Sequence, residues 1–174
     1  MVTTKHALVA MVADKPGVLN RMASLFRRRG FNIESIAVGH SELPNISRMT
    51  IIVDGTTAMV EQVRKQLEKV VDVIKVSDVT GEGTITRELA LIKVKTTSAN
   101  RSEVMQIVDI FRANIVDVAS DSVTVEVTGD EDKVDSLYNL LRGFGIKEIA
   151  RTGCVAMTRG GSGSLIVEER QAKK

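Results

Sequence analysis

The chain has 174 residues, of which 43% are hydrophobic and 26% charged, and a formal net charge of +2. This composition is typical of a globular protein with room for one large core or two small ones, and the low charge gives no electrostatic support for nucleic-acid or membrane binding. The single cysteine, Cys154, excludes an intrachain disulfide and disfavours a cysteine zinc site. The apolar run 7–13 is too short for a membrane span and lacks a signal-peptide cleavage region, so we expect a soluble cytoplasmic protein.

The first half of the chain predicts six elements in the order strand, helix, strand, strand, helix, strand. A buried strand at 6–12 is followed by a turn at 14–17, and apolar spacing from Val18 predicts a helix that Gly30 stops. Strands are expected at 32–40, 47–54 and 71–79. Thr56 or Thr57 caps the second helix, whose apolar stripe is expected to run from Val60 to Val71.

The same order begins again after Gly81-Glu82-Gly83. We expect a strand, a helix, a hairpin of two strands, a helix and a strand, at 87–97, 100–114, 115–120, 122–129, 130–144 and 146–157. The sequence therefore predicts an α+β fold of two ferredoxin-like βαββαβ domains, 1–80 and 81–158, followed by a flexible tail at 159–174. The first strand is apolar on both faces, so we expect open sheet faces or edges to pair with a second copy.

The sequence shows no pattern of catalytic residues. Neither histidine has a cysteine or a pair of carboxylates beside it, and His6 is expected at a sheet edge. There is no G-x-S-x-G elbow and no phosphate-binding loop. Cys154 lies in a strand-like run, where it would behave as a small hydrophobe. We therefore expect no catalytic residue, no metal site and no cofactor of the chain's own.

The entrance of the first helix has the features of a small-ligand site. A helix N-terminus attracts a carboxylate, and Gly17 leaves room for a ligand to approach the backbone. Asp14 and Asn32 carry oxygens that accept hydrogen bonds from an ammonium group. Together these groups suit the two ends of a free α-amino acid. A plain strand-to-helix turn explains the same spacing equally well.

The stretch DKPGVLNRMASLFRRRGFNIESIAVG resembles the signature of ACT domains, small βαββαβ modules that commonly bind amino acids where two copies pair. The further runs SRMTIIV, KQLEKVVDVIKV, RELALIKV, IFRANIVDV and FGIKEIARTG extend the resemblance to a single family over about residues 5–160. That family is the regulatory, or small, subunit of acetolactate synthase, also called acetohydroxyacid synthase.

The resemblance implies a function. The catalytic (large) subunit of the family uses thiamine diphosphate, Mg²⁺ and FAD in the first common step of branched-chain amino-acid synthesis. The small subunit is not an enzyme itself: it activates its partner and confers feedback inhibition, usually by valine. By position, the family's effector site falls on Asp14, Gly17, Val18 and Asn32, with Ile33 adjacent, and many relatives have Asn in place of Asp14. The resemblance also implies a homodimer through the N-terminal domains.

Two other functions are compatible with parts of the sequence. A stand-alone ACT-type regulator that senses amino acids would explain the first half, but no helix-turn-helix remains unassigned for binding DNA. An independent enzyme would need a thiamine-diphosphate motif, and we find none. The C-terminal repeat either stabilises dimers or contacts the catalytic subunit.

Overall fold

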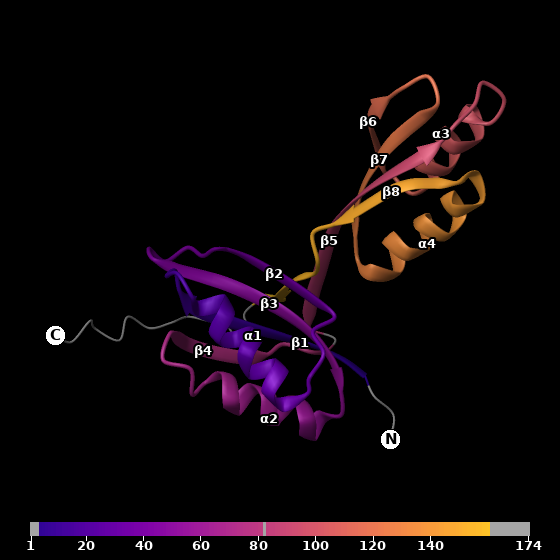
Figure 1. Ribbon diagram of the computed structural model, residues 1–174. Coiled ribbons are helices and arrows are strands. Elements are labelled where there is room, and N and C mark those ends of the chain that lie inside the picture. The colour runs from indigo at the N-terminus through magenta and orange to yellow at the C-terminus, as the bar shows by residue number, and fades with distance from the viewer. Residues whose placement is uncertain (1–3, 82, 161–174) are drawn as a thin grey trace. The chain divides into compact units, whose positions relative to one another are not determined.

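The computed structural model describes residues 4–81 and 83–160 (Figure 1). The described residues divide into two compact units, one made of 4–81, 83–85 and 156–160, the other of Thr86–Val155. Most of the predicted tail, 161–174, lies outside the described residues.

The first unit is a four-stranded antiparallel sheet with two helices on one face. Its elements are β1 (Thr4–Ala13), α1 (Val18–Arg29), β2 (Ser35–His40), β3 (Ile46–Gly55), α2 (Thr57–Leu67) and β4 (Val73–Asp78). The strand order is β2-β3-β1-β4, so β1 and β3 are central and β2 and β4 are edges. The predicted βαββαβ arrangement is confirmed.

The core of this unit lies between the sheet and the two helices. Leu8, Ala10 and Val12 alternate along β1 toward the helices and are buried. Helix α1 contributes Phe26, and α2 contributes Leu67, among other apolar side chains at helical spacing. Burial of these stripes orients α1 and fixes the position of the loop that precedes it.

The opposite face of the sheet is covered more fully than the sequence suggested. Val9 and Met11 point to this face and are fully buried. Arg48 of β3 shares their face and donates a hydrogen bond to the carbonyl oxygen of Ala156 at 2.8 Å. The expectation that this face needs a second copy is therefore wrong for β1, because its apolar side chains are already buried within the chain.

The second unit repeats the fold. Its elements are most of β5 (Thr84–Lys95), then α3 (Arg101–Ile110), β6 (Asn114–Val118), β7 (Ser122–Gly129), α4 (Glu131–Leu141), the 3₁₀ turn η1 (Arg142–Phe144) and β8 (Ile146–Arg151). The last strand, β9 (Val155–Thr158), falls in the first unit from Ala156 onward. The strand order is β6-β7-β5-β8, and β9 also pairs with β5. A separate core forms between this sheet and α3 and α4, with Ile92, Val108 and Leu137 at its centre.

Some predicted elements differ from the observed ones. The expected strand 146–157 is two strands, because Gly153 has a φ of 80° and interrupts the run, so Cys154 lies between strands. Helix α2 ends at Leu67, and Val71, expected in its buried stripe, is 92% exposed in the following turn. His6 lies on a central strand rather than at a sheet edge and is buried.

Candidate functional site

The loop between β1 and α1 leaves the entrance of α1 open. Gly17 is the N-cap residue with a φ of 89°, a conformation that costs an L-residue roughly 1–2 kcal/mol. No side chain caps the helix, and its first turn has no acidic residue. A Cβ atom built on Gly17 meets nothing within 4 Å, and the next residue, Val18, is buried in the core. The backbone at this helix N-terminus is therefore accessible to a negatively charged group.

A backbone contact holds the loop against the turn between β2 and β3. The N–H group of Asp14 donates to the carbonyl oxygen of Asn45 at 2.9 Å. That turn is closed by Ser41, whose hydroxyl and N–H group both donate to the carbonyl oxygen of Ile46. Asn45 itself has a φ of 59°, which asparagine tolerates better than most residues. The position of Asp14 is thus fixed by two elements that are distant in sequence.

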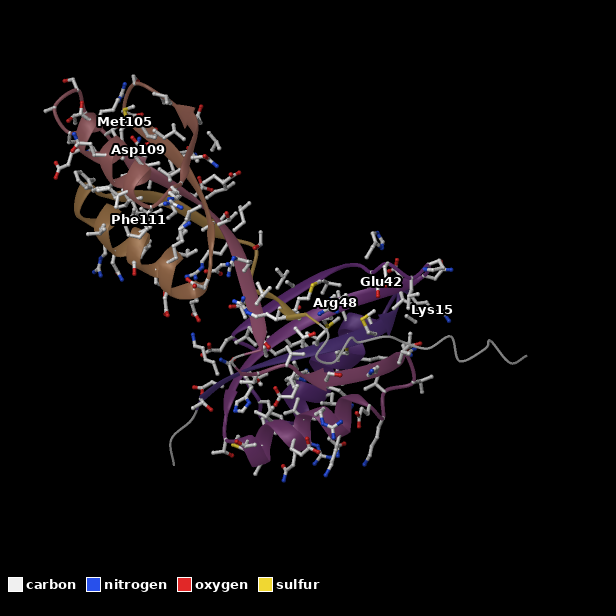
Figure 2. The ribbon with its side chains drawn as sticks, turned by 180° about the vertical axis from the view of Figure 1, so that it is seen from behind. Lys15, Glu42, Arg48, Met105, Asp109 and Phe111 are labelled. Atoms are coloured by element: carbon white, nitrogen blue, oxygen red, sulfur yellow. The ribbon has the colours of Figure 1, made fainter. Side chains whose placement is uncertain are left out.

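The imidazole of His40, the last residue of β2, lies beside the carboxylate of Asp14. The distance from Nδ1 of His40 to Oδ2 of Asp14 is 3.4 Å, and the two side chains are 87% and 47% exposed. Figure 2 shows Lys15 and Glu42 at the same end of the unit. The loop therefore presents an accessible carboxylate beside an open helix N-terminus, which are complementary to an ammonium group and a carboxylate.

Asn32 and Ile33 lie at the other end of α1. This helix has 12 residues and spans about 18 Å. The ion pair between Lys5 and Glu34, 3.2 Å long, ties the segment after α1 to the start of β1, whereas Asp14 follows the end of β1. Within one chain the structure brings together Asp14, Gly17 and Val18, and it leaves Asn32 and Ile33 apart from them.

An apolar groove of about 380 Å³ runs between α1 and the edge strand β2. Its lining is almost entirely apolar and includes Leu19, Ile33 and Ile36. Leu19 and Ile36, together with Val38, are 40–51% exposed although they lie on the helix-bearing side of the sheet. In the part of the chain that the structure describes, strand β2 pairs with β3 and is an edge of its sheet.

The described residues offer little for chemistry of their own. No three of their His, Cys, Asp and Glu side chains are grouped to hold a metal ion. His6 contacts Thr4, Thr80 and Asp78. Burial raises the pKa of the Cys154 thiol, which lowers its thiolate fraction and its reactivity. None of the helices in these ranges is long and apolar enough to cross a membrane.

Sequence reasoning missed the residues that complete the loop. His40 and Asn45 reach Asp14 only because β2 and β3 pair in one specific register, which the sequence does not specify. Ile36 and Val38 alternate with smaller residues as in a strand with one buried face, so the sequence pattern did not indicate that these two side chains are half-exposed. Only the strand order shows that this strand is an edge.

Comparison with known proteins gives one consistent result. Residues 8–75 match the family model of the AHAS small subunit-like ACT domain, and residues 87–160 match that of the small subunit of acetolactate synthase. The chain is 56% identical over 156 residues to the probable acetolactate synthase small subunit of Archaeoglobus fulgidus, covering 90% of this chain and 98% of that one. It is 50% identical over 158 residues to the acetolactate synthase small subunit of Mycobacterium bovis, covering 91% and 94%.

A solved structure gives the same result. The crystal structure of the acetolactate synthase small subunit from Thermotoga maritima superposes with a TM-score of 0.85 at 45% identity, covering 90% of this chain and 98% of that one. Sequence and structure agree over both units. The chain belongs to the acetolactate synthase small-subunit family.

Proposed function

We propose that this chain activates the catalytic subunit of acetolactate synthase and makes it sensitive to feedback inhibition by a branched-chain amino acid, valine in the first instance. Membership of the small-subunit family along nearly the whole chain implies a large catalytic partner. Thiamine diphosphate, Mg²⁺ and FAD would belong to that partner. The observation that carries the sensory part is the open helix entrance at Gly17 beside the Asp14 carboxylate.

The chemistry of the loop suits an α-amino acid with an aliphatic side chain. The uncapped N-terminus of α1 attracts the carboxylate of the effector, and the lack of a side chain at Gly17 permits close approach. Asp14 accepts hydrogen bonds from the ammonium group. Ile33 lines an apolar groove that can receive a branched side chain.

The separation of Asp14 and Gly17 from Asn32 and Ile33 supports a dimer. Strand β2 runs parallel to β1, so its start lies at the Asn32 end and its last residue, His40, at the Asp14 end. If two copies pair antiparallel through their β2 edges, Asn32 of one copy comes near Gly17 of the other. Two complete effector sites then form where the copies meet.

The apolar groove supports the same arrangement. A two-fold axis beside β2 brings the two α1 helices together, so that Leu19 of one copy meets the groove of the other. The half-exposed side chains Leu19, Ile36 and Val38 become buried, which stabilises association by the hydrophobic effect. An effector that binds one packing of the two copies more tightly than another shifts the equilibrium of the attached catalytic subunit.

Reconstitution tests the proposal. Acetolactate formation is measured for the catalytic subunit of the same organism alone, with one equivalent of this chain, and with valine added. We expect the chain to raise the rate several-fold and valine to remove most of that gain. A catalytic rate that is unchanged by a stoichiometric amount of the folded chain would overturn the regulatory assignment.

A further inference from the structure

The second unit has an exposed apolar surface where α3 lies beside the edge strand β6. Arg101, the first residue of α3, donates hydrogen bonds to the carbonyl oxygens of Ala119 and Ser120, which directly follow β6. This side of the helix therefore faces β6. Met105 and Asp109 follow Arg101 at intervals of four residues and lie on the same side (Figure 2).

Strand β6 adds two apolar side chains to this surface. Val118 pairs with Val123, which is buried in the core, so Val118 points to the helix-bearing side of the sheet. Val116 is the extra residue where the register of β6 with β7 shifts. Met105, Val116 and Val118 are 45–58% exposed. We call these three residues, together with Asp109, the α3–β6 face.

Asp109 carries a charge that the helix itself disfavours. It lies in the last turn of α3, where the negative end of the helix dipole repels a carboxylate and where the helix has no basic residue. Helix α1 has Arg27, Arg28 and Arg29 in its last turn, as the dipole favours. Among the described residues no ion pair compensates Asp109. A cation from another molecule would compensate it.

Strand β6 is poorly suited to pairing with β6 of a second copy. Val116 forms a bulge and Asp117 puts a charge on this edge, and both features hinder pairing between sheet edges. Strand β2, by contrast, pairs with β3 without a register shift from Ser35 to His40. A two-fold axis would moreover place Asp109 on both sides of one interface, where like charges repel. The α3–β6 face therefore fits a different protein better than a second copy.

We propose that the α3–β6 face binds the catalytic subunit of acetolactate synthase, on a surface that is apolar at its centre and carries a lysine or arginine for Asp109. This inference rests on the proposed function, which supplies the partner. It gives the two edges different tasks, because β2 pairs with a second copy while β6 and α3 hold the enzyme. Burial of Met105, Val116 and Val118 stabilises the complex, and the charge pair orients it.

Asp109→Lys tests the charge. The affinity of the full chain for the catalytic subunit of the same organism is measured by biolayer interferometry, and acetolactate formation is followed in parallel. Because like charges across an interface repel, we expect the dissociation constant of the complex to rise at least about tenfold, and the rise to shrink at high ionic strength. Lysine suits the last turn of a helix, so the variant should remain folded.

Glu103→Lys is the matched control, since it makes the same charge change on the same helix. Glu103 lies two residues before Met105, a step that turns the helix by about 200° and places Glu103 on nearly the opposite side. The affinity of this variant for the catalytic subunit should stay within about twofold of the wild-type value.

Val116→Lys tests the apolar part of the face. It should also raise the dissociation constant of the complex about tenfold, because a charge is costly to bury. Amide hydrogen exchange checks that the second unit is folded in each variant.

The outcomes separate the two proposals. A tenfold loss of affinity in Asp109→Lys and Val116→Lys, with Glu103→Lys unchanged, supports the α3–β6 face as the binding surface. Wild-type affinity and activation in all three variants overturn the face and leave the regulatory function standing. Weaker self-association of Asp109→Lys or Val116→Lys, at an unchanged affinity for the catalytic subunit, assigns the face to a second copy instead. A wild-type chain that neither binds nor activates the catalytic subunit overturns the proposed function, and this surface with it.

Discussion

The two units share a βαββαβ topology but differ at the entrance of their first helix. In the first unit α1 begins at Gly17, with no side-chain cap and open space where a Cβ would lie. In the second, α3 follows Asn100, whose side chain does not cap the helix either but accepts a hydrogen bond from the N–H group of Thr97 at 2.7 Å. Arg101 then donates to the carbonyl oxygens of Ala119 and Ser120, both at 2.8 Å, and ties α3 to the hairpin turn. Neither helix is capped by a side chain, but the first loop has a glycine at the N-cap position, whereas the side chains of the second contact their own loop and the hairpin turn.

This difference shows that the fold supplies a scaffold and that a few loop residues decide which copy of it can bind. A helix N-terminus attracts anions in either unit, but of the two only the first has an N-cap residue without a side chain. The edge strands β2 and β6 of the two sheets are more alike. Each carries two half-exposed apolar residues, Ile36 and Val38 on β2 and Val116 and Val118 on β6. The following predictions test how far the two units act independently, from the largest expected effect to the smallest.

The largest effect is expected in the two cores, which have no buried residue in common. Phe26→Ala in the first core should lower the free energy of unfolding of that unit by about 3–5 kcal/mol, through lost burial and the cavity left behind. Leu137→Ala should lower that of the second unit by about 2–5 kcal/mol. Amide hydrogen exchange measures the protection of each unit separately. Equal loss of protection in both units from either variant would show that they unfold as one.

The next effect distinguishes the two edge strands. Ile36→Lys puts a charge into the proposed β2 interface and should weaken the dimer by roughly 2 kcal/mol, about 30-fold in the dissociation constant, because a charge is costly to bury. Val116→Lys on β6 makes the equivalent change in the second unit and should leave that constant within about twofold. Sedimentation equilibrium measures both.

Val71→Lys, at an exposed turn of the first unit, is the control for added charge alone. If Val116→Lys weakens the dimer as much as Ile36→Lys, the second unit also contributes to dimerisation. The contrast between the edges would then be wrong.

The smallest expected effect concerns the stability of the first unit in acid. A hydrogen bond from Arg64 lowers the pKa of Glu61 to about 2, and Arg64 also pairs with Glu68 on α2. A depressed carboxyl pKa adds stability above the unfolded pKa, near 4.5, and that stability is lost as the pH falls toward 2. In Glu61→Gln, the free energy of unfolding of the first unit should fall slightly less steeply as the pH drops from about 4.5 toward 2.

Asp117→Asn on β6 is the control, because no ion pair joins the exposed Asp117 to another residue of the described ranges and it is not in the first turn of a helix. It should leave the acid limb of the second unit unchanged. Identical acid unfolding of the wild-type chain and Glu61→Gln would contradict the role of the Arg64 contact.

The sequence predicted the elements of both units well because their apolar residues follow regular helix and strand periods. Phe26 and Leu67 fall on the expected stripes. Val71 did not, because α2 ends at Leu67: in the turn that follows, Val70 still packs against the core but Val71 is exposed to solvent. His6 was misplaced because strand order depends on pairing between distant segments. For the same reason His40 could not be connected with Asp14, although Gly17 was identified from local turn chemistry alone.

The central claim, that the open entrance of α1 is an amino-acid sensor, is tested most directly by titrating L-valine into the chain and its variant Gly17→Asp. We predict saturable binding to the wild-type chain that the variant weakens at least about 100-fold, since like charges brought together cost several kcal/mol. Gly145→Asp is the control, because Gly145 also has a positive φ, 97°, but lies in the second unit. Equal valine binding by the wild-type chain and Gly17→Asp would contradict the claim.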